Sequence, residues 1–272
     1  MRALFGWAED VEEATMARIL VTGSSTGLGL MAAQLLIEQG HCVVVHGRNR
    51  ARADEAMASA RGAETVIIGD LSRVREMQEV AEQAHRLGRF DAVIHNAGVG
   101  YREPGRVETQ DRLPHVFAVN VLAPYVLTSL IGRPDRLVYL SSGMHHAVEP
   151  DLDDLLWTRR PWRGAQAYAE SKFYDVVLAF AVARLWPSVR ANALEPGWVA
   201  TRMGGEGAPG DMSKAHLTQA WLAVGNDALA LSSGEYFYHQ ALRAPNPLTR
   251  DREVQEKLLS ACARLSGVSL PS

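Results

Sequence analysis

The sequence predicts an α/β fold in one domain: a doubly wound parallel sheet of seven strands with helices on both faces. Short apolar runs alternate with longer stretches in which apolar residues recur at helical spacing. This alternation is typical of parallel strands joined by right-handed helical crossovers. The chain has 272 residues, 47% of them hydrophobic, so it can bury one large core without metals or disulfides. We expect this domain to cover residues 17–272.

The expected strands and helices follow one another in this alternating order. The apolar runs predicted to be strands are residues 19–21, 42–46, 65–68, 92–95, 137–140, 190–194 and 235–238. A helix follows the first strand as far as Leu36, and further helices are predicted at residues 54–60, 72–87, 111–131, 167–185 and 214–222. Pro114 suits a position near a helix start, and Pro124 predicts a kink inside its helix.

Composition and charge argue against several classes of protein. A net charge of −3 without a basic block does not indicate nucleic-acid binding. The longest apolar stretch, residues 176–185, is too short for a membrane span and contains Arg184. Cys42 and Cys262 are too few and too far apart for a disulfide framework, and no His or Cys residues have metal-ligand spacing. We therefore expect a cytoplasmic protein without a metal.

The first sixteen residues are predicted to be an extension outside the domain. They lack the cationic start and apolar region of a signal peptide, and Met16 directly precedes ARILVTG. Our hypothesis is that residues 1–15 are not needed for folding, or that the start codon is assigned too far upstream.

A glycine-rich turn joins the first strand to the first helix. Gly23, Gly27 and Gly29 give the spacing G-x-x-x-G-x-G directly after the apolar run at 19–21. Glycine permits a tight turn and a close approach of the main chain to a pyrophosphate, and the following helix N-terminus attracts the anion. The order strand, glycine turn, helix predicts a dinucleotide site.

Polar corners are expected at the carboxyl ends of the next strands, where ligands of such sheets bind. No acidic residue follows the second strand before Asp54, and Arg48 stands just beyond it, which favours a 2′-phosphate and hence NADP over NAD, with NAD still possible. Asp70 after the third strand suits either an adenine amino group or a helix cap. Asn96, followed by Ala97 and Gly98, forms the next corner.

Tyr168 and Lys172 lie four residues apart in AQAYAESKFYDVVLAF, one helical turn on the same face. A nearby ammonium favours the phenolate and is expected to pull the tyrosine pKa from about 10 toward neutrality. Alone, such a pair is more often an exposed Tyr and Lys on an amphipathic helix. The motifs upstream favour proton transfer instead.

Taken in order, six motifs resemble the short-chain dehydrogenase/reductase (SDR) family of the classical type, over roughly residues 17–240. They are TGSSTGLG, NAG, the Asn120 of FAVNVLAP, YLSS, YAESK and PGWVAT. The resemblance implies a Rossmann-type fold. The 26 residues between Ser142 and Tyr168, together with SGEYF at 233–237, look like the branch that includes retinol dehydrogenases, WW-domain oxidoreductases and protochlorophyllide reductases.

The resemblance also implies roles for individual residues. Tyr168 would exchange a proton with a carbonyl or alcohol oxygen, and Lys172 would lower its pKa and bind the nicotinamide ribose. Ser142, rather than Ser141, would orient the substrate oxygen, and Asn120 would hold a water linking Lys172 to solvent. The implied cofactor residues are Gly23, Ser25, Thr26, Gly27, Leu28, Gly29, Arg48, Asp70, Leu71, Asn96, Ala97, Gly98, Tyr168, Lys172, Pro196, Gly197, Val199 and Thr201.

The resemblance thus predicts an NADP(H)-dependent oxidoreductase acting on a small-molecule carbonyl or alcohol. Trp157, Trp162, Trp198 and Met203 are expected to form an apolar pocket, which favours a bulky apolar substrate. The glycine-rich segment at about 202–216 is expected to be a mobile lid, with an ordinary surface loop as the alternative. His145 and His146 follow the serines but are expected to be solvated.

Two other functions stay open. A dinucleotide-binding regulator could sense redox state without catalysis, although the four proton-handling residues are all present. An epimerase or dehydratase of the extended type is disfavoured by the glycine spacing and by the lack of a C-terminal substrate domain. The helices carrying Asn120 and Tyr168 look apolar on more than one face, which predicts a homodimer or homotetramer.

Overall fold

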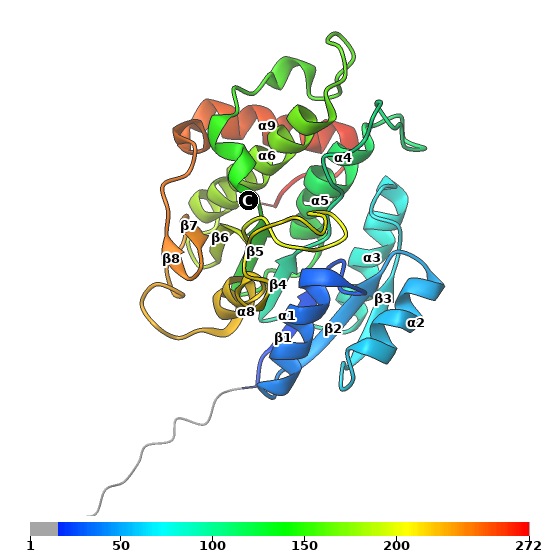
Figure 1. Cartoon of the computed structure of the whole chain (residues 1–272), viewed down its shortest axis with the longest axis vertical. Helices are drawn as coiled ribbons and strands as arrows, with labels where there is room; N and C mark the ends of the chain where they lie inside the picture. The colour runs from blue at the N-terminus through cyan, green and yellow to red at the C-terminus, as the bar shows by residue number, and fades with distance from the viewer. Residues whose placement is uncertain (1–15, 272) are drawn as a thin grey trace, which may run out of the picture.

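The computed structural model describes residues 16–271, which form the sheet and its covering helices shown in Figure 1. Strand order is β3-β2-β1-β4-β5-β6-β7-β8, and β1 to β7 pair in parallel. The predicted α/β fold, a doubly wound parallel sheet, is confirmed. The predicted extension falls almost wholly at residues 1–15, which lie outside the described residues.

The strands and helices have the following bounds. The strands are β1 (Arg18–Val21), β2 (Cys42–Gly47), β3 (Thr65–Ile68), β4 (Ala92–His95), β5 (Arg136–Leu140), β6 (Arg190–Glu195), β7 (Tyr236–Tyr238) and β8 (Ala241–Leu242). The helices are α1 (Gly27–Glu38), α2 (Arg50–Ser59), α3 (Val74–Arg86), α4 (His115–Phe117), α5 (Ala123–Leu130), α6 (Gly164–Leu185), α7 (Met212–Ala215), α8 (Leu217–Val224) and α9 (Arg252–Ser266).

The sheet has eight strands, so the prediction of seven was wrong by one. The additional strand, β8, is two residues long and pairs antiparallel with β7. Its hairpin turn has His239 and Gln240 at positive φ, 49° and 60°, the conformation of a two-residue turn that asparagine and glycine normally mark. Because neither residue is asparagine or glycine, the sequence carries no signal for this hairpin.

Two hydrophobic clusters fill the two sides of the sheet. Residues alternate along β1: Leu20 belongs to the cluster that includes side chains of α3, α5, α6 and α9, whereas Ile19 and Val21 belong to the cluster that includes side chains of α1, α2 and α8. The strands read as continuous apolar runs because both of their faces are covered. This arrangement places the carboxyl ends of the strands along one edge.

The helix predicted at 111–131 is interrupted. It begins at His115, passes through a π-helical segment at Ala118–Leu122, and continues as α5. Pro124 lacks the N–H that would bond to the carbonyl of Asn120 in a regular α-helix, so the irregularity expected at this proline takes the form of a π segment. The helix predicted at 214–222 is likewise two short helices, α7 and α8, which meet at His216.

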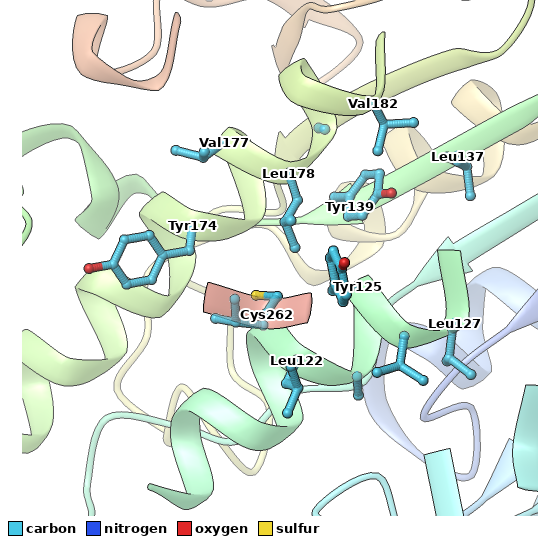
Figure 2. Close-up of a cluster of buried hydrophobic side chains, with 14 of the residues drawn as sticks. Leu122, Tyr125, Leu127, Leu137, Tyr139, Tyr174, Val177, Leu178, Val182 and Cys262 are labelled. Carbon is cyan, nitrogen blue, oxygen red and sulfur yellow. The ribbon is translucent and has the colours of Figure 1, made fainter. Parts of the chain in front are cut away.

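The C-terminal helix α9 was not predicted, and it covers the outer face of α6 (Figure 1). The side chain of Asp251 caps its first turn, and Gly267 ends it at φ 69°. Figure 2 shows Cys262 of α9 among side chains of α5 and α6, including Tyr125 and Leu178. Every residue of α6 from 167 to 182 is therefore buried.

The last described residues are bound to the same helices. The indole N–H of Trp186 donates to the carbonyl of Pro271 (2.8 Å), and the hydroxyl of Tyr125 donates to that of Val268 (3.0 Å). The second apolar face of α6, which suggested self-association, is thus packed within one chain. Across residues 16–271, no helix is both long and apolar enough to cross a bilayer.

We predict that Leu258→Ala lowers the free energy of unfolding by about 2 to 5 kcal/mol, because it removes a fully buried side chain between α9 and the core. Urea denaturation of the purified protein measures the change. Leu248→Ala, at a partly exposed leucine, is the matched control and should cost less than about 1 kcal/mol. Equal losses in the two variants would show that α9 does not hold the fold together.

Candidate active site

The glycine turn after β1 packs directly against the corner after β4. Gly23 has φ +63°, and an ideal Cβ there would lie 2.7 Å from the Cα of Ala97. A Cβ on Gly29 would lie 2.3 Å from the amide nitrogen of Asn96. Side chains at these two positions would push the two corners apart. The turn leads into the N-terminus of α1, whose first turn contains no acidic residue, so it suits an anion such as pyrophosphate.

Asn96 holds this arrangement together. Its side-chain amide donates to the carbonyls of Thr22 (3.0 Å) and Gly23 (3.1 Å). The hydroxyl of Thr22 in turn accepts from the backbone N–H groups of Asn96 and Ala97. Thr22 was not among the predicted residues, although its place at the end of β1 could have indicated it. The N–H groups of the Asn96 amide are thus used to join β1 to β4.

His46, which the sequence analysis missed, links the first three strand ends. Its Nδ1 accepts from the backbone N–H of Gly23 (3.0 Å), and its Nε2 lies 3.0 Å from the carbonyl of Gly69. Burial lowers the pKa of His46 to about 4, so the ring is neutral and its Nε2–H donates to Gly69. A histidine inside the apolar run VVVHG was the available signal.

The predicted adenosine-side residues differ in their surroundings. Arg48 is exposed and, within residues 16–271, forms no ion pair or side-chain hydrogen bond. Asp70 accepts from the backbone N–H of Ser72 (3.0 Å), which shapes the turn before α3. The expected cap at Ser72 is not formed, because α3 starts two residues later, with Arg73 at its N-cap and no side-chain cap. Leu71 is buried in the core, so its side chain faces away from this corner. The other implied cofactor residues also follow the ends of β1, β4 and β6 or lie on α6.

The predicted catalytic residues meet where β5 ends against α6. Tyr168 is 6% exposed, and the Ser142 side chain lies near enough to its hydroxyl to act against the rise of its pKa. The ammonium of Lys172 lies 5.9 Å from the centroid of the Tyr168 ring. Ser141 instead donates to the backbone carbonyl of Lys172 (2.6 Å), so it joins the strand to the helix. The arrangement supports Ser142 over Ser141 as the residue facing a substrate.

Burial raises the pKa of Tyr168 above its usual value of 10, and the opposing effects of Lys172 and Ser142 do not cancel the rise. The shift toward neutrality that the sequence predicted is therefore wrong for this structure. A phenolate in a nearly closed site loses its hydration. The carboxylate of Asp175 adds to the rise, and the sequence analysis did not consider this residue.

Asp175 is bound to the predicted catalytic lysine. The ammonium of Lys172 donates to Oδ2 of Asp175 (2.8 Å) and to the carbonyl of Leu140 (2.7 Å). Burial raises the pKa of Asp175 to about 7 although Lys172 pulls it down. The attraction of Asp175 and Tyr168 raises the pKa of Lys172 despite its burial. An acidic residue inside the apolar sequence FYDVVLAF was the signal for this pair.

Asn120 lies in the π segment, fully buried, and fixes the strand corner opposite Lys172. Its carbonyl oxygen accepts from the backbone N–H of Val99 (2.8 Å), and its amide donates to the carbonyl of Val99 and the hydroxyl of Ser171. A Cβ on Gly98 would lie 3.5 Å from the Asn120 oxygen and 3.6 Å from the Lys172 nitrogen. Gly98 thus stands between the two groups.

His145 corrects another expectation, because it is fully buried and not solvated. Its Nδ1–H donates to the carbonyl of Ser142 (2.8 Å), while its Nε2 accepts from the backbone N–H of Asn246 (3.2 Å). Burial lowers its pKa to about 4. His145 therefore supports the backbone of Ser142 from behind.

The four residues expected to share one apolar pocket are divided between two places. Trp157 is buried and packs edge-on against Trp162, with the guanidinium of Arg160 over its ring at 3.7 Å. Trp198 is 58% exposed and donates to the carbonyl of Gly204 (3.0 Å) in the loop. The expectation of a shared pocket is wrong, because the insert that carries Trp157 and Trp162 packs against α6.

An open cleft lies between the loop after β4 and the loop after β6. It is lined by Arg102, Trp198, residues 200–202 and residues 204–207. The carbonyl of Gly204 accepts from the hydroxyl of Tyr101 (3.4 Å), whose ring packs edge-on against Tyr168 at 5.7 Å. The cleft therefore lies beside the phenol. Among residues 16–271, no group of three or more His, Cys, Asp or Glu side chains is placed to bind a metal.

We predict that Gly29→Ala lowers the free energy of unfolding by about 1 to 3 kcal/mol, because its Cβ would collide with Asn96 and the carbonyl of Gly23. Gly132→Ala is the control, since its Cβ would meet no atom within 4 Å. Thermal or urea unfolding compares the two. A Gly29→Ala protein as stable as the control would contradict the tight contact between the corners.

We further predict that the contribution of His46 to the stability of the fold decreases as pH is lowered from 6.5 to 4. The unfolded chain binds a proton at its usual pKa of 6.5, but the folded chain only near 4. Folding must exclude that proton, so stability is lost as pH falls, by up to about 1.4 kcal/mol per pH unit. Urea unfolding of wild type and His46→Gln at several pH values measures this. A constant difference between the proteins would show that His46 is not held neutral.

Comparison with known proteins assigns the chain to a family. The family described as short chain dehydrogenase matches residues 17–134. An uncharacterized oxidoreductase of Emericella nidulans is 42% identical over 94% of this chain and 99% of its own length. Retinol dehydrogenase 13 of Homo sapiens is 30% identical over 93% of this chain and 86% of its own.

A solved structure shares the fold. The crystal structure of an uncharacterized protein from Mycobacterium paratuberculosis has a TM-score of 0.82 to this chain, covers 94% of it and 95% of its own length, and is 21% identical. The Rossmann-type sheet, the glycine turn and the identity to several dehydrogenases lead to one conclusion. The chain belongs to the short-chain dehydrogenase/reductase family, on the branch that resembles the retinol dehydrogenases.

Proposed function

We propose that this oxidoreductase uses NADP(H) to interconvert a carbonyl and an alcohol, with Tyr168 as general acid and base. One observation carries the proposal: a buried phenol, near Ser142 and faced by the ammonium of Lys172, lies beside the cleft between the loops after β4 and β6. Proton transfer by such a positioned group typically contributes about 10²- to 10⁴-fold to a rate.

The residues of the chain divide the work of this reaction. A bound nicotinamide supplies or accepts the hydride. Ser142 would orient the substrate oxygen, and Tyr168 would donate its proton to that oxygen in reduction or take it in oxidation. Lys172 would stabilise the phenolate left behind. The residues fit a dinucleotide because side chains are excluded at Gly23 and Gly29 and because the first turn of α1 carries no opposing carboxylate.

The preference for NADP over NAD rests on Arg48, with NAD as the alternative. Its guanidinium is exposed just after β2 and, within residues 16–271, has no ion pair that would compete for it. A guanidinium can bind a 2′-phosphate with two hydrogen bonds.

The expected result of Arg48→Ala is an NADPH affinity weaker by about 10- to 100-fold, from the loss of charge-assisted hydrogen bonds, with NADH affinity unchanged. Titration of the cofactor's fluorescence measures both. Arg50→Ala is the matched control, since Arg50 is a neighbouring exposed arginine paired with Asp54, and should leave NADPH binding unchanged. Tight NADH binding with negligible NADPH binding would overturn the proposal.

A bulky apolar carbonyl or alcohol remains the proposed substrate class. Support comes from Trp198, an exposed aromatic side chain that lines the cleft, and from Tyr101, whose ring packs against that of Tyr168. Residues 202–216 are proposed to close over the substrate. Two hydrogen bonds join this loop to the residues just before it: Gly210 donates to the carbonyl of Trp198 (2.8 Å), and the hydroxyl of Thr201 accepts from the N–H of Gly204.

A non-catalytic dinucleotide-binding regulator is the alternative function. Tyr168→Phe separates the two because it removes one hydroxyl and keeps the ring. We predict unchanged NADPH binding and a loss of carbonyl-dependent NADPH oxidation of at least about 10²-fold. A screen of aldehydes and ketones measures the activity. Undiminished turnover in this variant would exclude Tyr168 as the acid, and no turnover by the wild type on any compound would favour the regulator.

Location and assembly also remain proposals. The low cysteine content supports the proposed cytoplasmic location. We keep a homodimer or homotetramer as the proposed assembly, but infer that it does not form through the face of α6 that α9 covers. Light scattering gives the mass in solution, and chemical crosslinking maps the interface. Crosslinks between the α6 helices of two copies would contradict this inference.

A further inference from the structure

Asp175 is a buried carboxylate beside the catalytic pair that the proposed reaction does not use. It lies on α6, three residues after Lys172, and is 2% exposed. Removing a carboxylate from water is costly unless a partner compensates it. Its partner here is the ammonium that acts on Tyr168. Asp175 therefore belongs to the electrostatics of the site.

The contacts of Lys172 show how Asp175 fixes the ammonium. An ammonium has three N–H donors. One donates to Asp175 Oδ2 at 2.8 Å and another to the carbonyl of Leu140 at 2.7 Å. The third is left for the side on which Gly98 and Tyr168 lie. The aspartate and the strand carbonyl thus aim the lysine at the reactive side of the site.

Asp175 faces the ammonium of Lys172, and the other titratable groups near it are uncharged. Burial raises the pKa of Tyr139, on β5, so that its hydroxyl stays protonated, and Asp175 adds to the rise. Thr128 contacts Tyr139 (2.7 Å) and His95 of β4 (3.1 Å), and burial lowers the pKa of His95 to about 3. Both of these groups are uncharged at neutral pH.

We propose that Asp175 is a positioning residue for the proton transfer: it holds Lys172 in place, and its negative charge offsets part of the effect of that ammonium on the Tyr168 hydroxyl. This inference rests on the proposed function, in which Tyr168 exchanges the proton. The two charges act on the phenol in opposite directions, because Lys172 favours the phenolate and Asp175 disfavours it. The pair then adjusts an acidity of Tyr168 that burial dominates.

The proposal makes the acidity of Tyr168 sensitive to pH near neutrality. Burial raises the pKa of Asp175 to about 7. As pH rises through this value the carboxylate ionises and compensates Lys172. Below it, Asp175 is neutral and the ammonium acts on the phenol without opposition. The ring of Tyr101 packs edge-on against that of Tyr168, so its phenol also faces this group.

Tyrosine ionisation can be measured without a substrate. In protein labelled with ¹³C at the tyrosine ring carbon bearing the hydroxyl, the Tyr168 signal among the seven tyrosines is assigned by its loss in Tyr168→Phe. We expect Asp175→Asn, which keeps the shape and removes the charge, to lower the pKa of Tyr168 by on the order of one unit. If Tyr168 titrates before alkaline unfolding in Asp175→Asn but not in the wild type, its pKa is likewise lower in the variant.

Glu170→Gln is the matched control. Glu170 is also a buried carboxylate on α6, but its partner is Arg160 (2.6 Å). The Glu170→Gln substitution should leave the Tyr168 titration unchanged even if it lowers the stability of the protein. A Tyr168 pKa that is unchanged or raised in Asp175→Asn, or that falls equally in both variants, would overturn the proposal, as would a Tyr168 that titrates in neither the wild type nor Asp175→Asn.

The lysines provide a second measurement, since the chain contains only Lys172, Lys214 and Lys257. With ¹³C at the lysine carbon next to the ammonium, the wild-type Lys172 signal should shift as pH rises through about 7 and Asp175 ionises, and it should not shift in Asp175→Asn, while the other two signals stay the same in both proteins. Identical Lys172 signals would contradict the ion pair itself. Because neither measurement needs turnover, a protein that reduced no carbonyl would disprove the proposed function and leave this test intact.

Discussion

The contact between the ends of β1 and β4 is the constraint on which the site depends. In the strand order, β1 lies between β2 and β4, so the winding of the chain reverses there and the helices on either side diverge. The two corners approach so closely that Gly23 has no space for a Cβ, and Thr22 and Asn96 bind them together. His46 joins the β1 corner to the end of β3. The same contacts therefore shape the proposed phosphate site after β1 and the backbone at Gly98 beside Lys172.

The second determinant is the enclosure of α6. The sheet lies on one side of this helix and α9 on the other, so its polar residues are held in a medium that penalises charge. Tyr168, Lys172 and Asp175 consequently act as one group of coupled charges, and burial dominates the acidity of the phenol. In this environment a pair of residues four apart does not by itself fix a pKa.

Sequence patterns predicted the parallel sheet and the places where its strands end, because buried strands are continuous apolar runs and ligand corners carry glycine or polar residues. The same patterns could not give β8, whose turn uses His239 and Gln240 at positive φ, or the raised pKa of Tyr168, which depends on how deeply α6 is buried. Trp157 and Trp198 were grouped by residue type alone. In the structure Trp157 is buried and Trp198 is exposed.

The packing of α9 has a consequence for synthesis. The chain leaves the ribosome from its N-terminus, so α6 emerges well before the helix that shields its outer face. During that interval Tyr174, Val177 and Leu178, which are buried in the finished protein, have no covering layer. The nascent enzyme therefore exposes apolar surface to chaperones and neighbouring polypeptides until translation of its last segment is complete.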